Sequence, residues 1–347
     1  MFFKTIIQGR LEFATQKSYD KVFKMFEYRA ENYHRNEMIF ASEEIFNKEK
    51  LLLDIPRFVG TSSEKHFRNT ASLIDYCSQF AISGSVRAWL LDEGKILYYE
   101  MMEPTSDKAA VQSFLKGREL VKQIGKEKEA IEALDKAIEK YDRHAMAYER
   151  RAKVNFYLKD YHNALRDYNK CIDIDATIPT AYYGKAKINV IQEEWEEAIK
   201  NFDITLKHTV ALQPIYWKAR RQKAFCHIKL KQWTKAAFDL KLFSKRKFKE
   251  DNPNYEWKKQ AYYNYALVLL ELDDTADVLQ NLDAALELPE HPSVSTAEIL
   301  RTRGISKQRM GKNGFIKDLK DASDLGDKIA ERVLAERGKR KSKPKKV

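Results

Sequence analysis

The chain of 347 residues has little glycine, proline or cysteine, and it has no long apolar run. Its 12 glycines and 8 prolines fall well below the usual frequencies of about 7% and 5%. Barrels and sandwiches of many short strands need frequent turns, so this scarcity favours long helices. The three cysteines are odd in number and have no common spacing. This excludes a disulfide framework and fits a reducing compartment.

The absence of long apolar runs argues against a membrane-spanning helix. No stretch approaches the roughly 18 apolar residues of a spanning helix, and the opening MFFKTIIQGRLEF has no signal-peptide core. We therefore expect a cytoplasmic protein without membrane insertion. Hydrophobic residues make up 44% of the chain, which is enough to form a core.

The positive charge is unevenly distributed. The chain has 63 Lys and Arg against 51 Asp and Glu, a net charge of +12. Residues 1–105 carry a slight negative excess, whereas residues 337–347, RGKRKSKPKKV, hold seven basic residues and no acid. A segment this charged cannot pack into a core, so we predict a disordered basic tail over 337–347. Its basic residues are Arg337, Lys339, Arg340, Lys341, Lys343, Lys345 and Lys346.

The first 105 residues alternate between strand and helix patterns. Side chains alternate over residues 6–13, as in a strand, and helical spacing follows from Tyr19 to Tyr33 after a possible N-cap at Ser18. LLLDIPRFV, residues 51–59, is typical of a strand, and Pro56 suggests a sheet edge or the end of the strand.

A second amphipathic helix and a hairpin complete this region. Helical spacing runs from Phe67 to Ala81, and residues 86–91 and 96–101 flank a turn in which we expect Gly94 to adopt a positive φ angle. The order β-α-β-α-β-β predicts a small α+β domain over residues 1–105, with helices covering one face of a sheet.

No pattern in the chain indicates catalysis. The phosphate-binding and nucleophile-elbow motifs are absent, and no His, Cys or Asp residues have metal-ligand spacing. Cys77 lies on the apolar face of its helix, so we expect it to be buried and structural. The sequence predicts a non-enzymatic protein without a cofactor or metal.

From about residue 106 the sequence repeats every 34 residues. The segments EAIEALDKAIEKY (129–141), NALRDYNKCIDID (163–175) and EAIKNFDITLKHT (197–209) align. Small residues recur at one position of these segments and large apolar or aromatic residues at another. The small residues are Ala130, Ala164 and Ala198, and the large ones Leu134, Tyr168 and Phe202.

A 34-residue period with these residue types resembles the tetratricopeptide repeat, a helix-turn-helix unit. The resemblance implies a mostly α protein, in which five to six repeats stack as a solenoid over residues 106–336. Cys171 occupies a small-residue position of the repeat and is expected to be structural. Insertions near residues 213–214 and 251–255 separate the later repeats, and residues 328–337 are expected to form a capping helix.

The resemblance also implies which side chains line the concave surface. In this family, the second, fifth, ninth and twelfth residues of each first helix commonly do so. Transferring that register predicts a basic stripe interleaved with aromatic side chains. The candidate partner-binding residues are Lys153, Phe156, Tyr183, Lys187, Lys218, Arg221, Phe225, Tyr263 and Arg301.

Two functions are compatible with such a surface. The first is a protein-interaction scaffold or adaptor whose groove binds a partner protein or an acidic segment of one, since Arg and Lys meet carboxylates while aromatic rings supply burial. The second is an RNA- or ribosome-associated factor that uses the basic tail and the positive groove. A solvated, unoccupied helix face is the alternative to both. The repeat pattern favours the scaffold.

Overall fold

The computed structural model describes the backbone of residues 1–341 and the side chains of residues 1–337. It begins with the predicted small α+β fold. The strands are β1 (Phe3–Glu12), β2 (Phe46–Asn47), β3 (Leu52–Ser62), β4 (Ser83–Asp92) and β5 (Lys95–Met102). They form an antiparallel sheet in the order β2-β3-β1-β4-β5. The helices of this region are α1 (Gln16–Asn32), α2 (Ser42–Ile45) and α3 (Glu64–Ser78).

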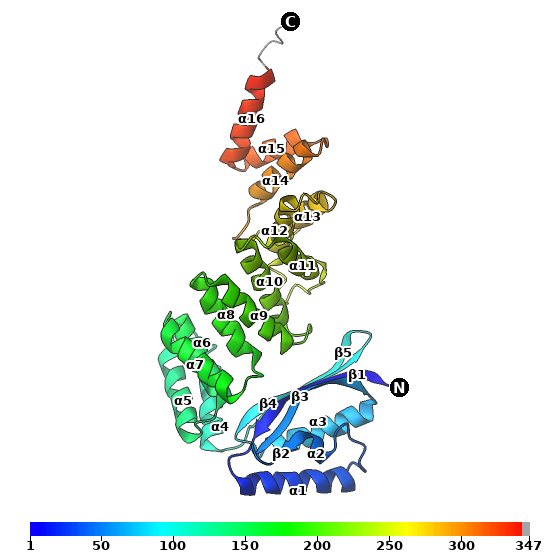
Figure 1. Ribbon diagram of the computed structural model, residues 1–347, viewed down its shortest axis with the longest axis vertical. Coiled ribbons are helices and arrows are strands. Elements are labelled where there is room, and N and C mark those ends of the chain that lie inside the picture. The colour runs from blue at the N-terminus through cyan, green and yellow to red at the C-terminus, as the bar shows by residue number, and fades with distance from the viewer. Residues whose placement is uncertain (342–347) are drawn as a thin grey trace. The chain divides into compact units, whose positions relative to one another are not determined.

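Helices α1 and α3 cover one face of the sheet, as expected (Figure 1). Ile7, Leu53 and Leu90 from three strands share a buried core with Phe26 of α1 and with α3. The hairpin between β4 and β5 is confirmed, with Gly94 at a φ of 82°. Strand β3 is second in the sheet order and not an edge strand, which differs from the interpretation of its proline. Its outer neighbour β2 pairs only with Leu52 and Leu53, so Pro56 lies beyond that pairing and breaks no bond to β2.

Two further details differ from the sequence interpretation. The N-cap of α1 is Thr15, whose side chain accepts a hydrogen bond from the Ser18 N–H, so Ser18 lies inside the first turn. The short elements α2 and β2 were not predicted, because four and two residues are too few to show a periodicity.

The remaining helices follow one another in pairs along the chain (Figure 1). The first three pairs are α4 (Ala109–Leu120) with α5 (Glu127–Lys140), α6 (Ala145–Tyr157) with α7 (Tyr161–Ile174), and α8 (Pro179–Ile191) with α9 (Trp195–Lys207). The next three are α10 (Pro214–Lys229) with α11 (Trp233–Lys245), α12 (Lys258–Glu271) with α13 (Val278–Leu286), and α14 (Thr296–Arg309) with α15 (Phe315–Asp324). A last helix, α16, spans Lys328–Lys341.

The repeated small and large positions are buried where these helices meet. Ala130, Ala164 and Ala198 have no exposed surface, and Leu134, Tyr168 and Phe202 are buried beside them. The two predicted insertions fall in the loops before α10 and α12. Helix α16 extends to Lys341, so the first residues of the predicted tail have helical backbone. Residues 342–347, including Lys343, Lys345 and Lys346, lie outside the described residues.

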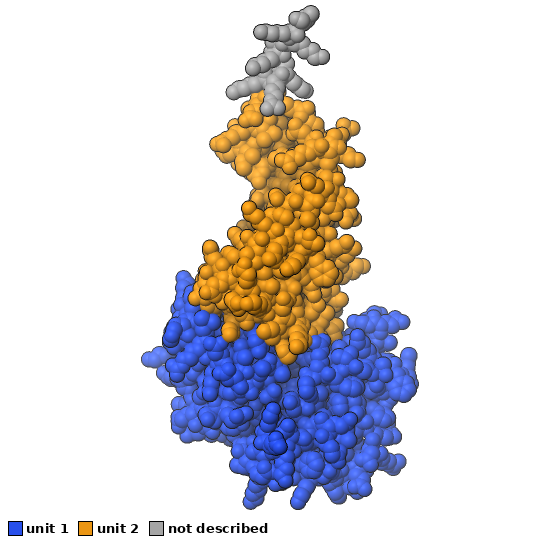
Figure 2. All heavy atoms as spheres, in the orientation of Figure 1, with its two compact units in different colours: residues 1–184 blue, residues 185–347 orange. Residues whose placement is uncertain are grey.

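The chain divides into two compact units, residues 1–184 and residues 185 onward (Figure 2). The predicted domain boundary after residue 105 falls inside the first unit. There the sheet is tied to the helices that follow it. Arg10 of β1 forms an ion pair with Asp175 at 3.0 Å, and the Tyr141 hydroxyl donates to Glu12 at 2.8 Å. Glu12 is buried, and this burial raises the pKa of its carboxyl group.

One arrangement of three charged side chains recurs along the helix pairs: a cation that contacts two aspartates. We call it an ion triad. In the first unit, Arg151 of α6 makes two hydrogen bonds to Asp167 of α7, at 2.7 and 2.8 Å, and one to Asp135 of α5, at 2.6 Å. The cation on the first helix of one pair therefore joins an aspartate of its own second helix to an aspartate of the preceding pair.

The same arrangement occurs twice in the second unit. Lys223 of α10 contacts Asp203 of α9 at 2.8 Å and Asp239 of α11 at 3.3 Å. In the last two pairs, Arg303 of α14 joins Asp283 of α13 to Asp318 of α15. Asp239 and Asp318 are buried, so each triad compensates a carboxylate that water cannot reach.

A buried histidine gives the first unit a specific pH dependence. His144 caps α6 by accepting the Ala147 N–H, and its ring packs on Phe114 at 4.6 Å. Burial lowers the pKa of His144 to about 4, so the folded state holds it neutral. Above the unfolded pKa near 6.5, the neutral His144 makes its full contribution to the free energy of unfolding. As the pH falls from 6.5 towards 4, this contribution is lost, because the unfolded chain takes up a proton on the histidine and the folded chain does not.

We predict that this histidine accounts for a loss of about 3 kcal/mol of stability in that window. His144→Asn keeps a capping side chain and removes the titration. Urea denaturation between pH 7 and pH 4 should show a smaller loss of stability in the variant. Equal losses in the variant and the natural chain would contradict the assignment.

Candidate functional site

The second unit contains a pocket of about 170 Å³ between α10 and α12. We call it the α10–α12 pocket. Two predicted site residues, Arg221 and Phe225, lie one turn apart on α10 and line it. The other lining residues are Gln222, Leu240, Trp257, Gln260, Ala261 and Asn264. The pocket thus combines aromatic surface, three side-chain amides and one guanidinium group.

The guanidinium group of Arg221 is held by an aromatic ring. Its carbon Cζ lies 3.7 Å from the centre of the Trp257 ring, a close cation–π contact. Stacking fixes the plane of the guanidinium and keeps its charge at the pocket. Trp257 comes from the loop inserted before α12, so the period of the repeats gave no indication of it.

Phe225 belongs to a second aromatic contact. Its ring packs edge-on against Trp195 at 5.8 Å, and the Lys229 ammonium group lies 5.3 Å from the Phe225 ring and 5.9 Å from the Trp195 ring. These contacts make a second cation–aromatic cluster, between α10 and the start of α9. Lys218 is half-buried on α10, about one turn before Arg221 and about two turns before Phe225.

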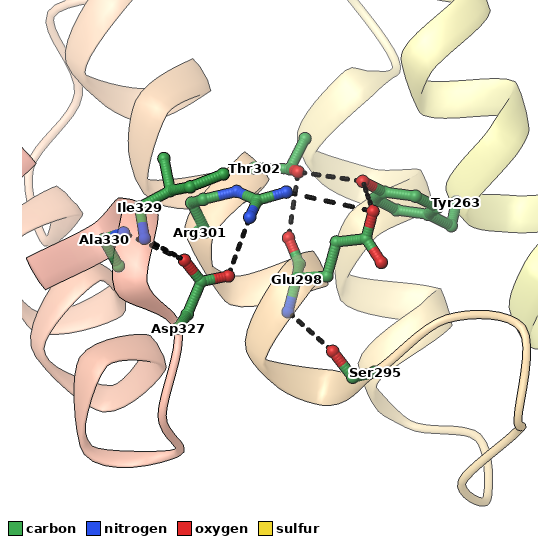
Figure 3. Close-up of polar contacts among 8 residues, drawn as sticks. All are labelled: Tyr263, Ser295, Glu298, Arg301, Thr302, Asp327, Ile329 and Ala330. Carbon is green, nitrogen blue, oxygen red and sulfur yellow. Dashed lines mark hydrogen bonds and ion pairs between the residues drawn. The ribbon is translucent and has the colours of Figure 1, made fainter.

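Tyr263 and Arg301 belong to a separate polar network (Figure 3). The Tyr263 hydroxyl donates to Glu298 at 3.0 Å and lies 3.2 Å from the Thr302 hydroxyl. Arg301 donates to Asp327 at 2.8 Å, and its guanidinium lies 3.8 Å from Glu298. Burial raises the pKa of Tyr263 to about 12, so its hydroxyl stays protonated at neutral pH.

Asp327 also supports the last helix. Its carboxylate accepts the N–H groups of Ile329 and Ala330 at 2.9 Å, as an N-cap does (Figure 3). Arg301 therefore links α14 to the start of α16, and its charge is compensated within the repeat stack. Arg301 is thus a member of the predicted basic stripe with two carboxylate neighbours, Asp327 and Glu298.

The other predicted residues lie on α6 and α8. Lys153 and Phe156 lie on α6, where the Lys153 ammonium is 5.7 Å from the Tyr157 ring and Phe156 packs against Tyr161. Tyr183 and Lys187 lie one turn apart on α8, and both are half-buried. Tyr183 belongs to the first compact unit and Lys187 to the second.

The cysteines are buried as expected. Cys77, Cys171 and Cys226 are all free thiols without exposed surface. Burial raises the pKa of the Cys77 and Cys226 thiols to about 12 and also raises that of Cys171. Such thiols are protonated and inert at neutral pH. Among residues 1–337, no group of three or more acidic, histidine or cysteine side chains is arranged to hold a metal ion.

Comparison with known proteins identifies the repeats. The tetratricopeptide repeat family matches residues 145–178, which comprise α6, α7 and the adjoining turns. A Hsp70-Hsp90 organizing protein of Triticum aestivum is 31% identical over 109 residues, which are 31% of this chain and 19% of that protein. The match thus covers less than a fifth of that relative's length.

Two solved structures share the fold. YrrB, described as a TPR protein with an unusual peptide-binding site, superposes with a TM-score of 0.50 at 21% identity, over 59% of this chain and 99% of that one. PilF of Pseudomonas aeruginosa superposes with a TM-score of 0.51 at 15% identity, over 66% of this chain and 98% of that one. The chain therefore contains a segment that matches the tetratricopeptide repeat, and its paired helices share the fold of these two proteins. It is mostly α-helical, and the helix pairs are preceded by a small sheet-containing region. Within residues 1–341, no helix is long and apolar enough to cross a membrane.

Proposed function

We propose that this protein is a non-enzymatic scaffold that binds an acidic segment of a partner protein, with the α10–α12 pocket as its anchor. The observation that carries the proposal is the stacking of Arg221 on Trp257 at the mouth of a pocket lined by amide side chains. A stacked guanidinium meets a carboxylate in a fixed plane, and the amides of Gln260 and Asn264 can pair with peptide groups.

The comparisons support the class of ligand. YrrB is described as having a peptide-binding site, and the wheat relative is an organizing protein for Hsp70 and Hsp90. Phe225 adds apolar surface beside the cation, a combination typical of interface residues that contribute strongly to binding. On the expected register, Lys187, Lys218 and Arg221 face the same ligand.

The proposal predicts a strong effect of charge reversal. Lys187→Glu with Arg221→Glu should lower affinity for the partner captured by the full chain at least about 100-fold, because both positions would repel an acidic segment. Capture from the protein's own cells, with nuclease added, identifies the partner. Titration of that purified partner then measures the affinity of each variant.

A matched control separates local from general charge effects. Lys128→Glu with Lys136→Glu makes the same change of net charge on exposed positions of α5. This control should bind as the natural chain does. If both double variants lost binding equally, or if neither did, the pocket would not be the binding site.

A further inference from the structure

The most basic part of the chain is residues 204–249, which hold 13 Lys and Arg and a single acid, Asp239. Their excess of +12 equals the net charge of the whole protein. Asp239 is buried and already paired with Arg220 and Lys223. The positive charge of this segment is therefore not compensated by exposed acids of its own.

The uncompensated charge gathers on α11 and the turns at its ends. We call residues 231–247 the α11 basic patch. Six exposed cations lie in it: Lys231, Lys235, Lys241, Lys245, Arg246 and Lys247. Within the part of the chain whose side chains are described, none of the six forms an ion pair. Many cations elsewhere do, such as Arg118, Lys200 and Arg303.

Two exposed apolar side chains lie among these cations. Phe238 is 61% exposed and Leu242 is 38% exposed. They are four residues apart, so they project from the same face of α11 as neighbours. Lys235 and Lys241 lie three residues to either side of Phe238, and Lys245 lies three residues after Leu242. The exposed face of α11 is thus apolar at its centre and basic around it.

The patch is held on a rigid support. The opposite face of α11 buries Ala236, Leu240 and Phe243 in the core of the second unit. After the helix, Phe248 packs on Phe243 and Trp217, and Arg246 lies 5.7 Å from the Trp217 ring. The cations at the end of α11 therefore need little ordering when a ligand binds.

We propose that the α11 basic patch binds the surface of an anionic phospholipid bilayer. Lysines near such a surface are attracted to its headgroups, and Phe and Leu side chains enter the boundary between headgroups and acyl chains. A bilayer needs no matching pocket, so it suits apolar side chains that protrude from a helix. Binding is peripheral.

Nucleic acid fits the patch less well. Surfaces that bind single strands interleave several aromatic rings with their cations, so that successive bases stack. The patch exposes Phe238 together with an aliphatic residue, Leu242, which has no stacking role. The exposed side chains of the patch are also distinct from the α10–α12 pocket, which α11 reaches only through its buried Leu240. The failure of one proposal therefore does not decide the other.

The test is co-sedimentation of the full chain with vesicles. We expect binding to vesicles of phosphatidylcholine with about 30% phosphatidylserine, little binding to phosphatidylcholine alone, and release by salt. Lys235→Glu, Lys241→Glu and Lys245→Glu together should lower the partition coefficient at least about 100-fold, since each lysine contributes about fivefold. Phe238→Ser should weaken binding at unchanged charge.

A matched control is Lys128→Glu, Lys136→Glu and Lys170→Glu, three exposed positions on α5 and α7. It should bind vesicles more than tenfold better than the patch variant. Equal binding by the two variants would overturn the proposal. So would equal binding of the natural chain to both vesicle types, or loss of single-stranded RNA retention without loss of vesicle binding.

A second measurement does not depend on the charge variants folding. Phe238→Cys can be labelled with a polarity-sensitive fluorophore, because the native cysteines are buried. A blue shift on addition of the phosphatidylserine vesicles supports insertion of this position. The same label with an unchanged spectrum would count against it.

Discussion

Arg151→Met is expected to destabilise the first unit by about 3–5 kcal/mol. Asp167 is buried, with 5% of its side chain exposed, and its carboxylate receives two hydrogen bonds from Arg151. Removal of the guanidinium would leave this buried charge without a cation. Amide hydrogen exchange in α6 and α7 should accelerate by about 100-fold or more, as the pair opens locally.

A double variant tests the mechanism. Arg151→Met with Asp167→Leu removes both charges, so it should recover most of the lost stability. Lys200→Met is the control, since the Lys200–Glu197 pair is exposed and should contribute less than about 1 kcal/mol. If the double variant were as unstable as Arg151→Met, the loss would come from packing and not from the orphaned carboxylate.

Gly184→Ala is expected to cost about 2–3 kcal/mol, although alanine favours helices by about 1 kcal/mol. A Cβ atom at this position of α8 would lie 2.1 Å from Cζ of Tyr168. Tyr168 is itself buried, so its ring cannot move without disturbing the core. Thermal unfolding and hydrogen exchange of α7 measure this effect.

The clash predicts a specific rescue. Tyr168→Leu with Gly184→Ala should be more stable than the sum of the two single changes implies, because the smaller side chain makes room. Gly304→Ala is the control. Its Cβ would lie 3.0 Å from Cγ of Leu319 and 3.1 Å from the backbone oxygen of Phe315, a milder overlap than the 2.1 Å at Gly184, so Gly304→Ala should cost less. Equal losses of stability in Gly184→Ala and Gly304→Ala would show that the overlap with Tyr168 does not determine the effect at Gly184.

The sequence predicted most of the repeat architecture, because small and aromatic residues repeat at a spacing set by local packing. The ion triads were not predicted from the sequence, for a physical reason. Aspartate at the position of Asp135 recurs as Asp203 but is replaced by Asn169 in the pair between them. The triads therefore recur every second repeat, and a strict 34-residue comparison hides them.

The candidate site was predicted in part. Arg221 and Phe225 came from the register of the resembled family, and both line the α10–α12 pocket. Trp257 lies in an insertion outside that register, and the partnership of Arg301 with Asp327 joins two helices whose contact no local pattern encodes. The acid-poor stretch from Ile204 to Lys249 was visible in the sequence, but only the structure separates its paired cations from the exposed ones.

One measurement tests the proposed scaffold most directly: a photo-crosslinking amino acid placed at Phe225 in the full chain, expressed in its own cells. Thr234, an exposed position on α11, carries the same group as the control. The account predicts one protein adduct at position 225 that resists nuclease and disappears with Arg221→Glu. An adduct at position 225 that nuclease removes, or a protein adduct at 234 and none at 225, would contradict it.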